Sequence, residues 1–244
     1  MEQEGFSAEW PAPPSVKTWI TTRSGGVSSA PYASNNLATH VGDDPVAVEK
    51  NRQQLLQQLQ LQQPPQWLEQ VHGTIVVKVP STLAAVPKAD GCWTDQPQQP
   101  CAVLTADCMP ILITNQKGTQ VAALHAGWRG LAAGVIAQGV QRFEDPREEL
   151  LVWLGPSIGQ SSYEVGEEVR EAFCMQDARA ETAFVPSPNG RWLASMEQLA
   201  RLRLKQLHVE AVYGGGWDTA TDERFYSYRK EGETGRLASL IWME

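Results

Sequence analysis

Histidine is scarce in this sequence, with 4 residues among 244, and cysteine is equally scarce, with 4. The cysteines form no C-x-x-C pair, and a chain of this length needs no disulfide framework, so a reducing cytoplasm is the expected compartment. A cysteine taken alone is more often a small buried apolar residue than a reactive one. A chemical role for any of them therefore needs a suitable partner side chain.

Long apolar runs and an excess of positive charge are also missing. Residues 1–14 are acidic at the start and lack the apolar stretch of a signal peptide, and no later segment offers about 18 consecutive apolar residues. We expect neither secretion nor membrane insertion. The formal net charge of -8 argues against nucleic-acid and anionic-membrane partners, which are captured by clustered Lys and Arg. The sequence gives no indication of the oligomeric state.

What is present is enough apolar material for one core, with a hydrophobic fraction of 42% and 9 Trp. We interpret residues 1–244 as a single domain in which residues 1–15 form a loosely ordered N-terminal segment. Strand and helix patterns alternate without a regular β-α-β rhythm and without a repeat of fixed period. The expected class is α+β or mixed α/β, with mixed sheets flanked by helices.

Periodicity and turn residues predict the individual elements. Strands are expected at 17–22, 74–79, 101–105, 110–114, 119–125 and 150–154, with further strands around a polar turn between 225 and 242. Helices are expected from Asp44-Pro45 through Leu61 and at 129–143, 164–173 and 195–207, the last opened by a capping box of Ser195 and Gln198.

Two of the histidines lie at predicted strand ends, where functional side chains are common. His72 precedes one strand, and His125 ends the second strand of a predicted hairpin. If the hairpin turn is centred between Gln116 and Lys117, Cys108 faces His125 with Cβ atoms roughly 5 Å apart, close enough to share one ion. Two His and one Cys leave a fourth position open on zinc, as in catalytic zinc sites. We therefore predict that these three residues bind zinc and form the catalytic centre.

Other polar residues are candidates for supporting roles. Asp107 could orient a ligand, although an Asp in a turn commonly caps the backbone. His40 could cap the following helix, contact substrate or have no chemical role. Arg23, Arg52 and Arg129 are candidates for binding an anion such as phosphate, because guanidinium groups and free backbone amides suit it. A solvated surface role is the commoner outcome for any single arginine.

The same residues leave three alternatives open. Without metal, Cys108 as nucleophile and His125 as base would form a hydrolase site for an amide or peptide bond. With Met109, the ligands could be drawn as a blue-copper site, but 4 histidines cannot supply the additional cluster of a multicopper oxidase. A non-enzymatic binding module is the weakest alternative, since it gives no use for an open metal position.

Several motifs in one order resemble those of the YfiH-type laccase-domain family, also called multicopper polyphenol oxidoreductases. The motifs extend from about Val16 to Trp242 and read TTRSGGVS, NNLATHVGDD, WLEQVHG, TADCMPILI, ALHAGWRGL, GPSIG, YEVG and FYSYRKEGETGR. The resemblance implies a purine nucleoside phosphorylase with adenosine deaminase and methylthioadenosine phosphorylase activity, acting on a purine nucleoside and phosphate. It also implies that His72, Cys108 and His125 are zinc ligands.

The resemblance carries two further implications. The first is a mixed-sheet fold related to that of certain cysteine-dependent deamidating toxins. The second is a link to peptidoglycan precursor editing, which suits the metal-free Cys-His hydrolase alternative. The chain departs from the family pattern at Ala194-Ser195-Met196, where relatives show Asp-Leu, and at Trp217-Asp218-Thr219, where they show Cys-Thr.

Overall fold

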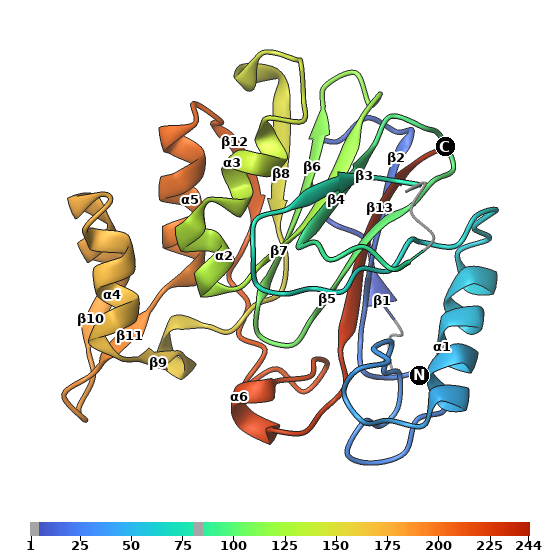
Figure 1. The fold of residues 1–244 in the computed structure, drawn as a ribbon, viewed down its shortest axis with the longest axis horizontal. Coiled ribbons are helices and arrows are strands. Elements are labelled where there is room, and N and C mark those ends of the chain that lie inside the picture. Colours follow the sequence, from blue (N-terminus) through green and yellow to red (C-terminus); the bar gives the residue numbers. More distant parts are fainter. Residues whose placement is uncertain (1–4, 81–84) are drawn as a thin grey trace.

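The computed structural model of the chain describes residues 5–80 and 85–244. Strands and helices are mixed along the chain, and the strands form three sheets, so the predicted α+β class is confirmed (Figure 1). None of the described helices combines the length and the apolar character needed to cross a bilayer. The single-domain interpretation stays a prediction.

A six-stranded mixed sheet forms the centre of the fold. Its two outer pairs are parallel and its three inner pairs antiparallel. In spatial order the strands are β12 (Ala211–Gly214), β8 (Leu150–Leu154), β6 (Met109–Asn115), β7 (Val121–Ala126), β4 (Gly91–Thr94) and β3 (Val76–Lys78). Every residue of β6, β7 and β8 is buried, because this sheet is covered on both faces.

A four-stranded antiparallel sheet covers one face of the central sheet. Its strands, in order, are β1 (Gly5–Phe6), β2 (Val16–Thr21), β13 (Leu237–Met243) and β5 (Cys101–Thr105). Ile20, Val103 and Ile241 from this sheet pack in one apolar cluster with Leu112 and Ala123 of the central sheet. Burial of such side chains contributes about 25 cal/mol per Å² of apolar surface, which holds the two sheets face to face.

Helices form the outer layers. The helices α2 (Trp128–Ala133), α3 (Val135–Val140) and α5 (Met196–Gln206) cover the other face of the central sheet, where Leu131, Ile136 and Leu199 join its core cluster. The helix α1 (Pro45–Gln58) lies on the outside of the four-stranded sheet through Leu55 (Figure 1). The four layers are therefore helix, sheet, sheet and helices.

The remaining elements lie in the second half of the chain. The helix α4 (Glu167–Cys174) adjoins a small sheet of β9 (Glu164–Val165), β11 (Trp192–Ala194) and β10 (Phe184–Pro186). The helix α6 (Tyr228–Glu231) precedes β13. Short 3₁₀ segments span Arg147–Glu149, Gln160–Ser162 and Ala178–Ala183.

Local sequence signals are confirmed where neighbouring residues decide the structure. The strands at 101–105 and 150–154 have the predicted bounds. The Asp44 carboxylate accepts from the amide of Val46 at the start of α1, and the Ser195 hydroxyl accepts from the amide of Gln198 at the start of α5. Capping side chains act within a few residues, so the sequence alone reveals them.

Four predictions need correction. Residues 5–15, expected to be loosely ordered, include β1, which pairs with β2; residues 1–4 lie outside the described residues. The helix predicted at 164–173 begins at Glu167, after strand β9. Between 225 and 242, the helix α6 takes the place of the first predicted strand. The helix predicted at 129–143 is divided at Gly134, which has φ +100° and ends α2.

The predicted hairpin register is wrong by two residues. His125 lies opposite Pro110, and Thr114 opposite Val121. The turn is centred one residue further along the chain, because Gly118 adopts φ +64° and donates its amide to the Asn115 carbonyl over 3.0 Å. Cys108 therefore lies just before β6 and diagonally across from His125.

The break at Gly134 predicts a stability effect. A Cβ atom at this position would have no neighbour within 4 Å, so the left-handed backbone is the main obstacle to a side chain. We expect Gly134→Ala to lower the free energy of unfolding by about 1–2 kcal/mol in urea denaturation. Gly134→Asn is the matched control and should lose less, because Asn tolerates this conformation. Equal losses in both variants would contradict the explanation.

Candidate metal centre

Three side chains from separate segments meet at one end of the central sheet. His125 lies on β7, Cys108 precedes β6, and His72 lies in the turn before β3. The Cys108 Sγ and His72 Nε2 atoms are 3.7 Å apart, and the two imidazole ring centroids are 4.8 Å apart. One donor atom from each residue lies within 4.8 Å of the others. The structure thus brings the three predicted metal ligands together, despite the error in the hairpin register.

Glycine between the ligands permits this approach. A Cβ atom on Gly127 would lie 2.6 Å from the His72 ring and 3.1 Å from the Cys108 sulfur, so no other residue fits without displacement. A Cβ atom on Gly130 would lie 2.7 Å from the Gly73 carbonyl oxygen. The two glycines of the HAGWRG motif therefore allow α2 to pack against the turn that carries His72.

A buried carboxylate, which the sequence does not reveal, orients the His125 imidazole and holds the backbone of His72. Asp90 has 0% of its surface exposed and lies directly before β4. Its Oδ1 atom lies 2.9 Å from His125 Nδ1 and accepts from the amide of His72 over 2.8 Å. Its Oδ2 atom accepts from the amides of Gly73 and Val71. A metal-bound imidazole commonly has its second nitrogen on a carboxylate in this way, which directs His125 Nε2 toward the other ligands.

The charges of the site favour a thiolate. Burial opposes ionisation of the Cys108 thiol, but the neighbouring His125 and His72 lower its pKa to about 6. Burial would likewise lower the pKa of His125, but the Cys108 sulfur and the Asp90 carboxylate raise it to about 9. In the absence of metal, the two side chains therefore form an ion pair at neutral pH. A thiolate is also the form of cysteine that binds metal.

The donor set fits a divalent zinc ion. With bond lengths of about 2.3 Å to sulfur and 2.0 Å to nitrogen, tetrahedral ligands lie roughly 3.5 Å from one another. The 3.7 Å between Cys108 Sγ and His72 Nε2 is close to that spacing. Because His72 is exposed and His125 is buried, a fourth ligand would approach from the solvent side.

A hollow of about 450 Å³ opens beside the three ligands. Apart from the ligands, the residues that line it are His40, Gln70, Leu104, Thr105, Ala106, Tyr228 and Arg236. The Gln70 amide accepts from the Leu104 amide and donates to its carbonyl, both over 2.7 Å, so this wall is rigid. A volume of this order suits a small organic ligand.

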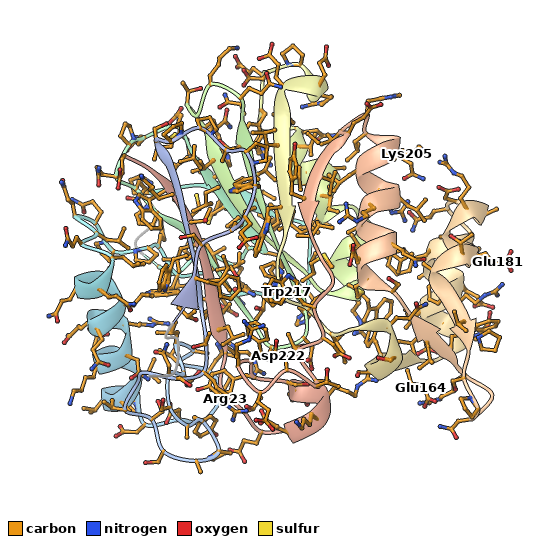
Figure 2. All side chains as sticks on the ribbon, turned by 180° about the vertical axis from the view of Figure 1, so that it is seen from behind. Arg23, Glu164, Glu181, Lys205, Trp217 and Asp222 are labelled. Atoms are coloured by element: carbon orange, nitrogen blue, oxygen red, sulfur yellow. The ribbon has the colours of Figure 1, made fainter. Side chains whose placement is uncertain are left out.

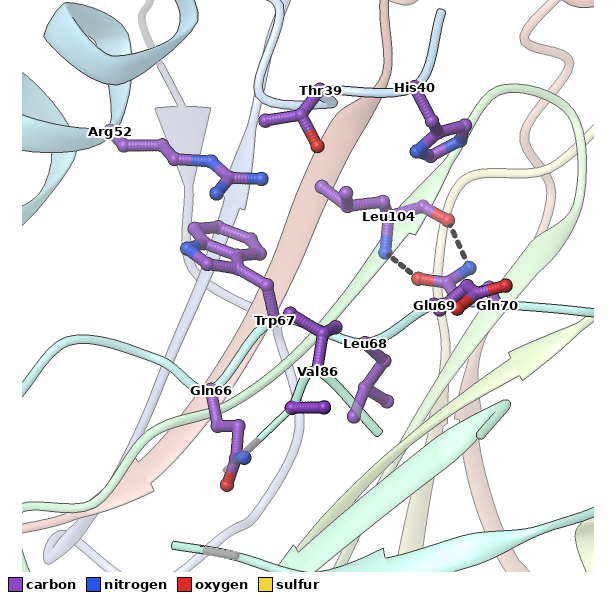
Figure 3. A pocket seen from close by; sticks show the side chains of 11 residues that line it. Thr39, His40, Arg52, Gln66, Trp67, Leu68, Glu69, Gln70, Val86 and Leu104 are labelled. Carbon is purple, nitrogen blue, oxygen red and sulfur yellow. Dashed lines mark hydrogen bonds between the residues drawn. The ribbon is translucent and has the colours of Figure 1, made fainter. Parts of the chain in front are cut away.

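A second hollow, of about 710 Å³, adjoins the first (Figure 3). Both are lined by His40, Gln70 and Leu104, and the second also contains Arg52 and Trp67. Figure 3 shows Arg52 and His40 along one rim, with Thr39 between them. Of the predicted phosphate-binding residues, His40 thus lines the hollow beside the ligands, and Arg52 lines the adjoining hollow.

The other two predicted phosphate-binding residues lie elsewhere. Arg23 forms an ion pair with Glu231 over 2.7 Å and lines a separate hollow with Asp222 (Figure 2). Arg129 is exposed, with its guanidinium 4.3 Å from the centroid of the Trp128 ring. Neither residue lines the hollow beside the ligands. Their predicted role in binding phosphate stays a prediction that this geometry does not support.

Asp107 supports the site in a different way from the one predicted. Its carboxylate contacts neither histidine ring in the described hydrogen bonds; Oδ1 accepts from the Thr219 hydroxyl over 2.6 Å, and Oδ2 accepts from the Arg229 amide over 2.7 Å. Asp107 has φ +82°, which is uncommon for a residue other than glycine. The segment containing Thr219, where the sequence departs from the family pattern, therefore holds the turn that presents Cys108.

Comparison with known proteins decides the family. The profile described as multi-copper polyphenol oxidoreductase laccase matches residues 17–244. The chain belongs to this laccase-domain family. A Pseudomonas aeruginosa protein named purine nucleoside phosphorylase is 52% identical over 98% of both chains. The Escherichia coli purine nucleoside phosphorylase YfiH is 49% identical over 96% of this chain and 97% of its own.

Solved structures of the laccase-domain family share the fold. A crystal structure of a Neisseria meningitidis protein superposes with a TM-score of 0.96 and 47% identity, covering 99% of this chain and 100% of the other. The structure of YlmD from Geobacillus stearothermophilus gives a TM-score of 0.89 at 28% identity, covering 100% and 97%. The expected YfiH-type fold is therefore confirmed.

The role of the buried carboxylate is open to a direct test. We expect Asp90→Asn to weaken zinc binding by about 10- to 100-fold. The side-chain NH₂ group of Asn would face the backbone N–H groups and the imidazole N–H, which all need an acceptor. Competition with a chromogenic chelator measures the affinity. Asp145→Asn is the matched control, since that carboxylate binds Asn115 and Lys117 away from the ligands. Equal affinities in wild type and Asp90→Asn would refute the assignment.

Proposed function

We propose that this chain is a zinc-dependent purine nucleoside phosphorylase with adenosine deaminase activity. The observation that carries the proposal is the open His72–Cys108–His125 cluster beside a hollow of nucleoside-compatible size. The names of relatives at 52% and 49% identity support the phosphorylase activity. Four free cysteines, one of them needed as a thiolate, suit a reducing cytoplasm.

Phosphorolysis makes two demands on the site. An oxygen of phosphate forms a bond to C1′ of the ribose while the N-glycosidic bond breaks, and its electron pair and a proton go to the purine. The site must therefore hold an anion next to the sugar and stabilise charge on the departing base. When bound, zinc would supply a Lewis acid for the base and, in deamination, lower the pKa of the attacking water.

The residues of the chain would provide the orientation. Asp90 fixes the ring of His125, while the two hydrogen bonds between the Gln70 side chain and the Leu104 backbone fix one wall of the hollow. The exposed ring of Tyr228 lines the same hollow and would cover a planar base. The substrate would thus lie between a rigid wall and the three ligands.

One observation favours a second candidate, a metal-free cysteine hydrolase. Cys108, His125 and Asp90 form a nucleophile, a base and a carboxylate in sequence, with the carboxylate 2.9 Å from His125 Nδ1. This arrangement meets the geometric requirement for a cysteine nucleophile. In that mechanism, however, His72 has no assigned task, although its Nε2 atom lies 3.7 Å from the sulfur. Zinc binding employs all three side chains.

Copper is the less suitable metal, in spite of the family description. A copper oxidase of the multicopper type needs many imidazoles, and the sequence contains 4 histidines. Among the described residues, the His72–Cys108–His125 group is the metal-binding cluster found. Zinc suits a mixed thiolate and imidazole set and needs no redox partner.

The proposed reaction predicts a dependence on phosphate. Zinc-replete protein incubated with adenosine should release adenine when phosphate is present and not when it is omitted. Inosine formed without phosphate would identify the deaminase activity. Chromatography of the bases and nucleosides distinguishes these products. A Cys108→Ala variant, lacking one zinc ligand, should lose both activities; full activity in this variant would disprove the proposed site.

Alkylation of Cys108 separates the zinc enzyme from the cysteine hydrolase. In metal-free protein, the low pKa predicts that iodoacetamide reacts at half its maximal rate near pH 6, because the thiolate predominates above that value. One equivalent of zinc should suppress the reaction at pH 7, and a chelator should restore it. Peptide mass spectrometry measures the modification. Cys174, whose pKa is raised by burial, is the internal control and should react slowly with or without zinc.

If zinc gave Cys108 no protection, the free thiolate of the hydrolase would be the better description of the site.

A further inference from the structure

The two hollows adjoin, because His40, Gln70 and Leu104 line both of them, and we refer to the two together as the groove. Arg236 lies in the part that contains the metal ligands, and Arg52 lies in the outer part. Two guanidinium groups from distant segments therefore line the same groove on either side of His40. We call His40, Arg52 and Arg236 the arginine wall.

Arg236 is a half-buried cation whose charge is not balanced by an ion pair. Its Nη1 atom donates to the carbonyls of Thr234 and Gly235, over 2.8 and 2.9 Å, which fixes the plane of the guanidinium. Among the described residues, its Nε and Nη2 atoms have no hydrogen-bond partner, and no carboxylate lies within ion-pair distance. Burial lowers the pKa of Arg236, as expected for a cation in a poorly solvated position.

Arg52 is held in a similar manner. Its Nε and Nη2 atoms donate to the Leu37 carbonyl, and its guanidinium lies 4.2 Å from the centroid of the Trp67 ring. Among the described residues, Nη1 has no hydrogen-bond partner and no ion pair is formed. Burial lowers the pKa of this guanidinium to about 10, so it remains charged at neutral pH. Figure 3 shows it pointing into the groove beside Trp67.

His40 completes the wall with an uncharged donor. Partial burial and the two neighbouring guanidinium groups of Arg236 and Arg52 lower the pKa of His40. A neutral imidazole offers one N–H donor. Glu69, the acidic residue that lines the outer hollow, is exposed and paired with Lys88 over 3.3 Å. Glu49 near Arg52, and Cys108 and Asp107 near Arg236, form no ion pair with these guanidinium groups within 4.0 Å among the described residues.

We propose that the arginine wall binds a phosphate group, with Arg236 and Arg52 as its charged donors. Planar guanidinium groups with fixed orientation and free N–H groups match phosphate oxygens. By contrast, Arg224 is paired with Asp222 and Arg23 with Glu231, so these two guanidinium groups lack this property. The phosphate is either the free co-substrate or the phosphoryl group of a nucleotide. The first identity rests on the proposed function, whereas anion binding itself does not.

Direct binding of inorganic phosphate tests the wall without turnover. We expect Arg236→Gln and Arg52→Gln in zinc-replete protein to weaken phosphate binding by roughly 10- to 100-fold in isothermal titration calorimetry, because each removes charge-assisted hydrogen bonds. Arg236→Lys should retain more of the affinity than Arg236→Gln, since it keeps the charge. Thermal unfolding of each variant verifies the fold.

Arg142→Gln is the matched control, because Arg142 is an exposed arginine that lines neither hollow. Unchanged phosphate affinity in folded Arg236→Gln and Arg52→Gln would overturn the proposal, as would an equal loss in Arg142→Gln. Phosphate binding that depends on the wall, in a protein that cleaves no nucleoside, would retain the subsite and refute the proposed function. Phosphate-dependent cleavage with an unchanged KM for phosphate in both variants would retain the proposed function and refute the subsite.

Adenosine 5′-monophosphate distinguishes the two sources of the phosphate group. If the wall binds free co-substrate, the nucleotide should bind no more tightly than adenosine, and phosphate should bind in the presence of adenosine. If it binds a nucleotide, the phosphoryl group should increase affinity about tenfold over adenosine, and Arg236→Gln should abolish the gain. Both outcomes support an anion site, whereas wall variants that leave the binding of both ligands unchanged contradict it.

Discussion

The buried carboxylate of Asp90 is the interaction on which the site depends. An anion without exposed surface is tolerated only when its oxygens are fully hydrogen-bonded, and Asp90 receives three backbone amides and one imidazole. The strand pairing of β4 with β7 places it there, because the amide of His125 donates to the Asp90 carbonyl over 2.7 Å. Asp90 thus couples the central sheet to the orientation of the His125 imidazole and to the backbone position of His72.

Backbone conformations around the site reflect the same constraint. His72 has φ +60° and Asp107 has φ +82°, both uncommon for residues with a side chain. Each is stabilised by hydrogen bonds, His72 through its amide to Asp90 and Asp107 through Thr219 and Arg229. His72 is itself a ligand, and Asp107 directly precedes the ligand Cys108. Fixed backbone at these two positions limits the reorganisation needed when an ion binds.

The sequence predicts those features that depend on composition or on residues close together in the chain. Scarce histidines at strand ends indicate His72 and His125, and an apolar run predicts the strand that follows Cys108. The sequence could not identify Asp90, because nothing in its local pattern shows that β4 pairs with β7. The predicted hairpin register is wrong because Gly118 adopts a left-handed conformation, which shifts the centre of the turn. Several loop conformations fit this sequence, and the sequence alone does not choose between them.

Arginines illustrate why substrate residues are harder to predict than metal ligands. The HAGWRG motif predicts that Arg129 binds phosphate, but its guanidinium lies over the Trp128 ring. Arg236, which directly precedes β13, lines the hollow beside the metal ligands instead. Coordination requires a specific donor chemistry, so few residues qualify. An anion, by contrast, can bind to any accessible guanidinium group that has no carboxylate partner. Tertiary structure decides which arginines are paired with carboxylates and which are not.

The overall charge sharpens this distinction. The chain has a formal net charge of -8, so most of its surface repels phosphate at long range. Many surface arginines add little local attraction, because carboxylates such as Glu231 beside Arg23 neutralise them. Arg52 and Arg236 keep their charge in a groove where reduced solvation strengthens electrostatic interactions. An acidic protein can therefore attract an anion to a single groove next to a metal centre, provided that its guanidinium groups there remain unpaired.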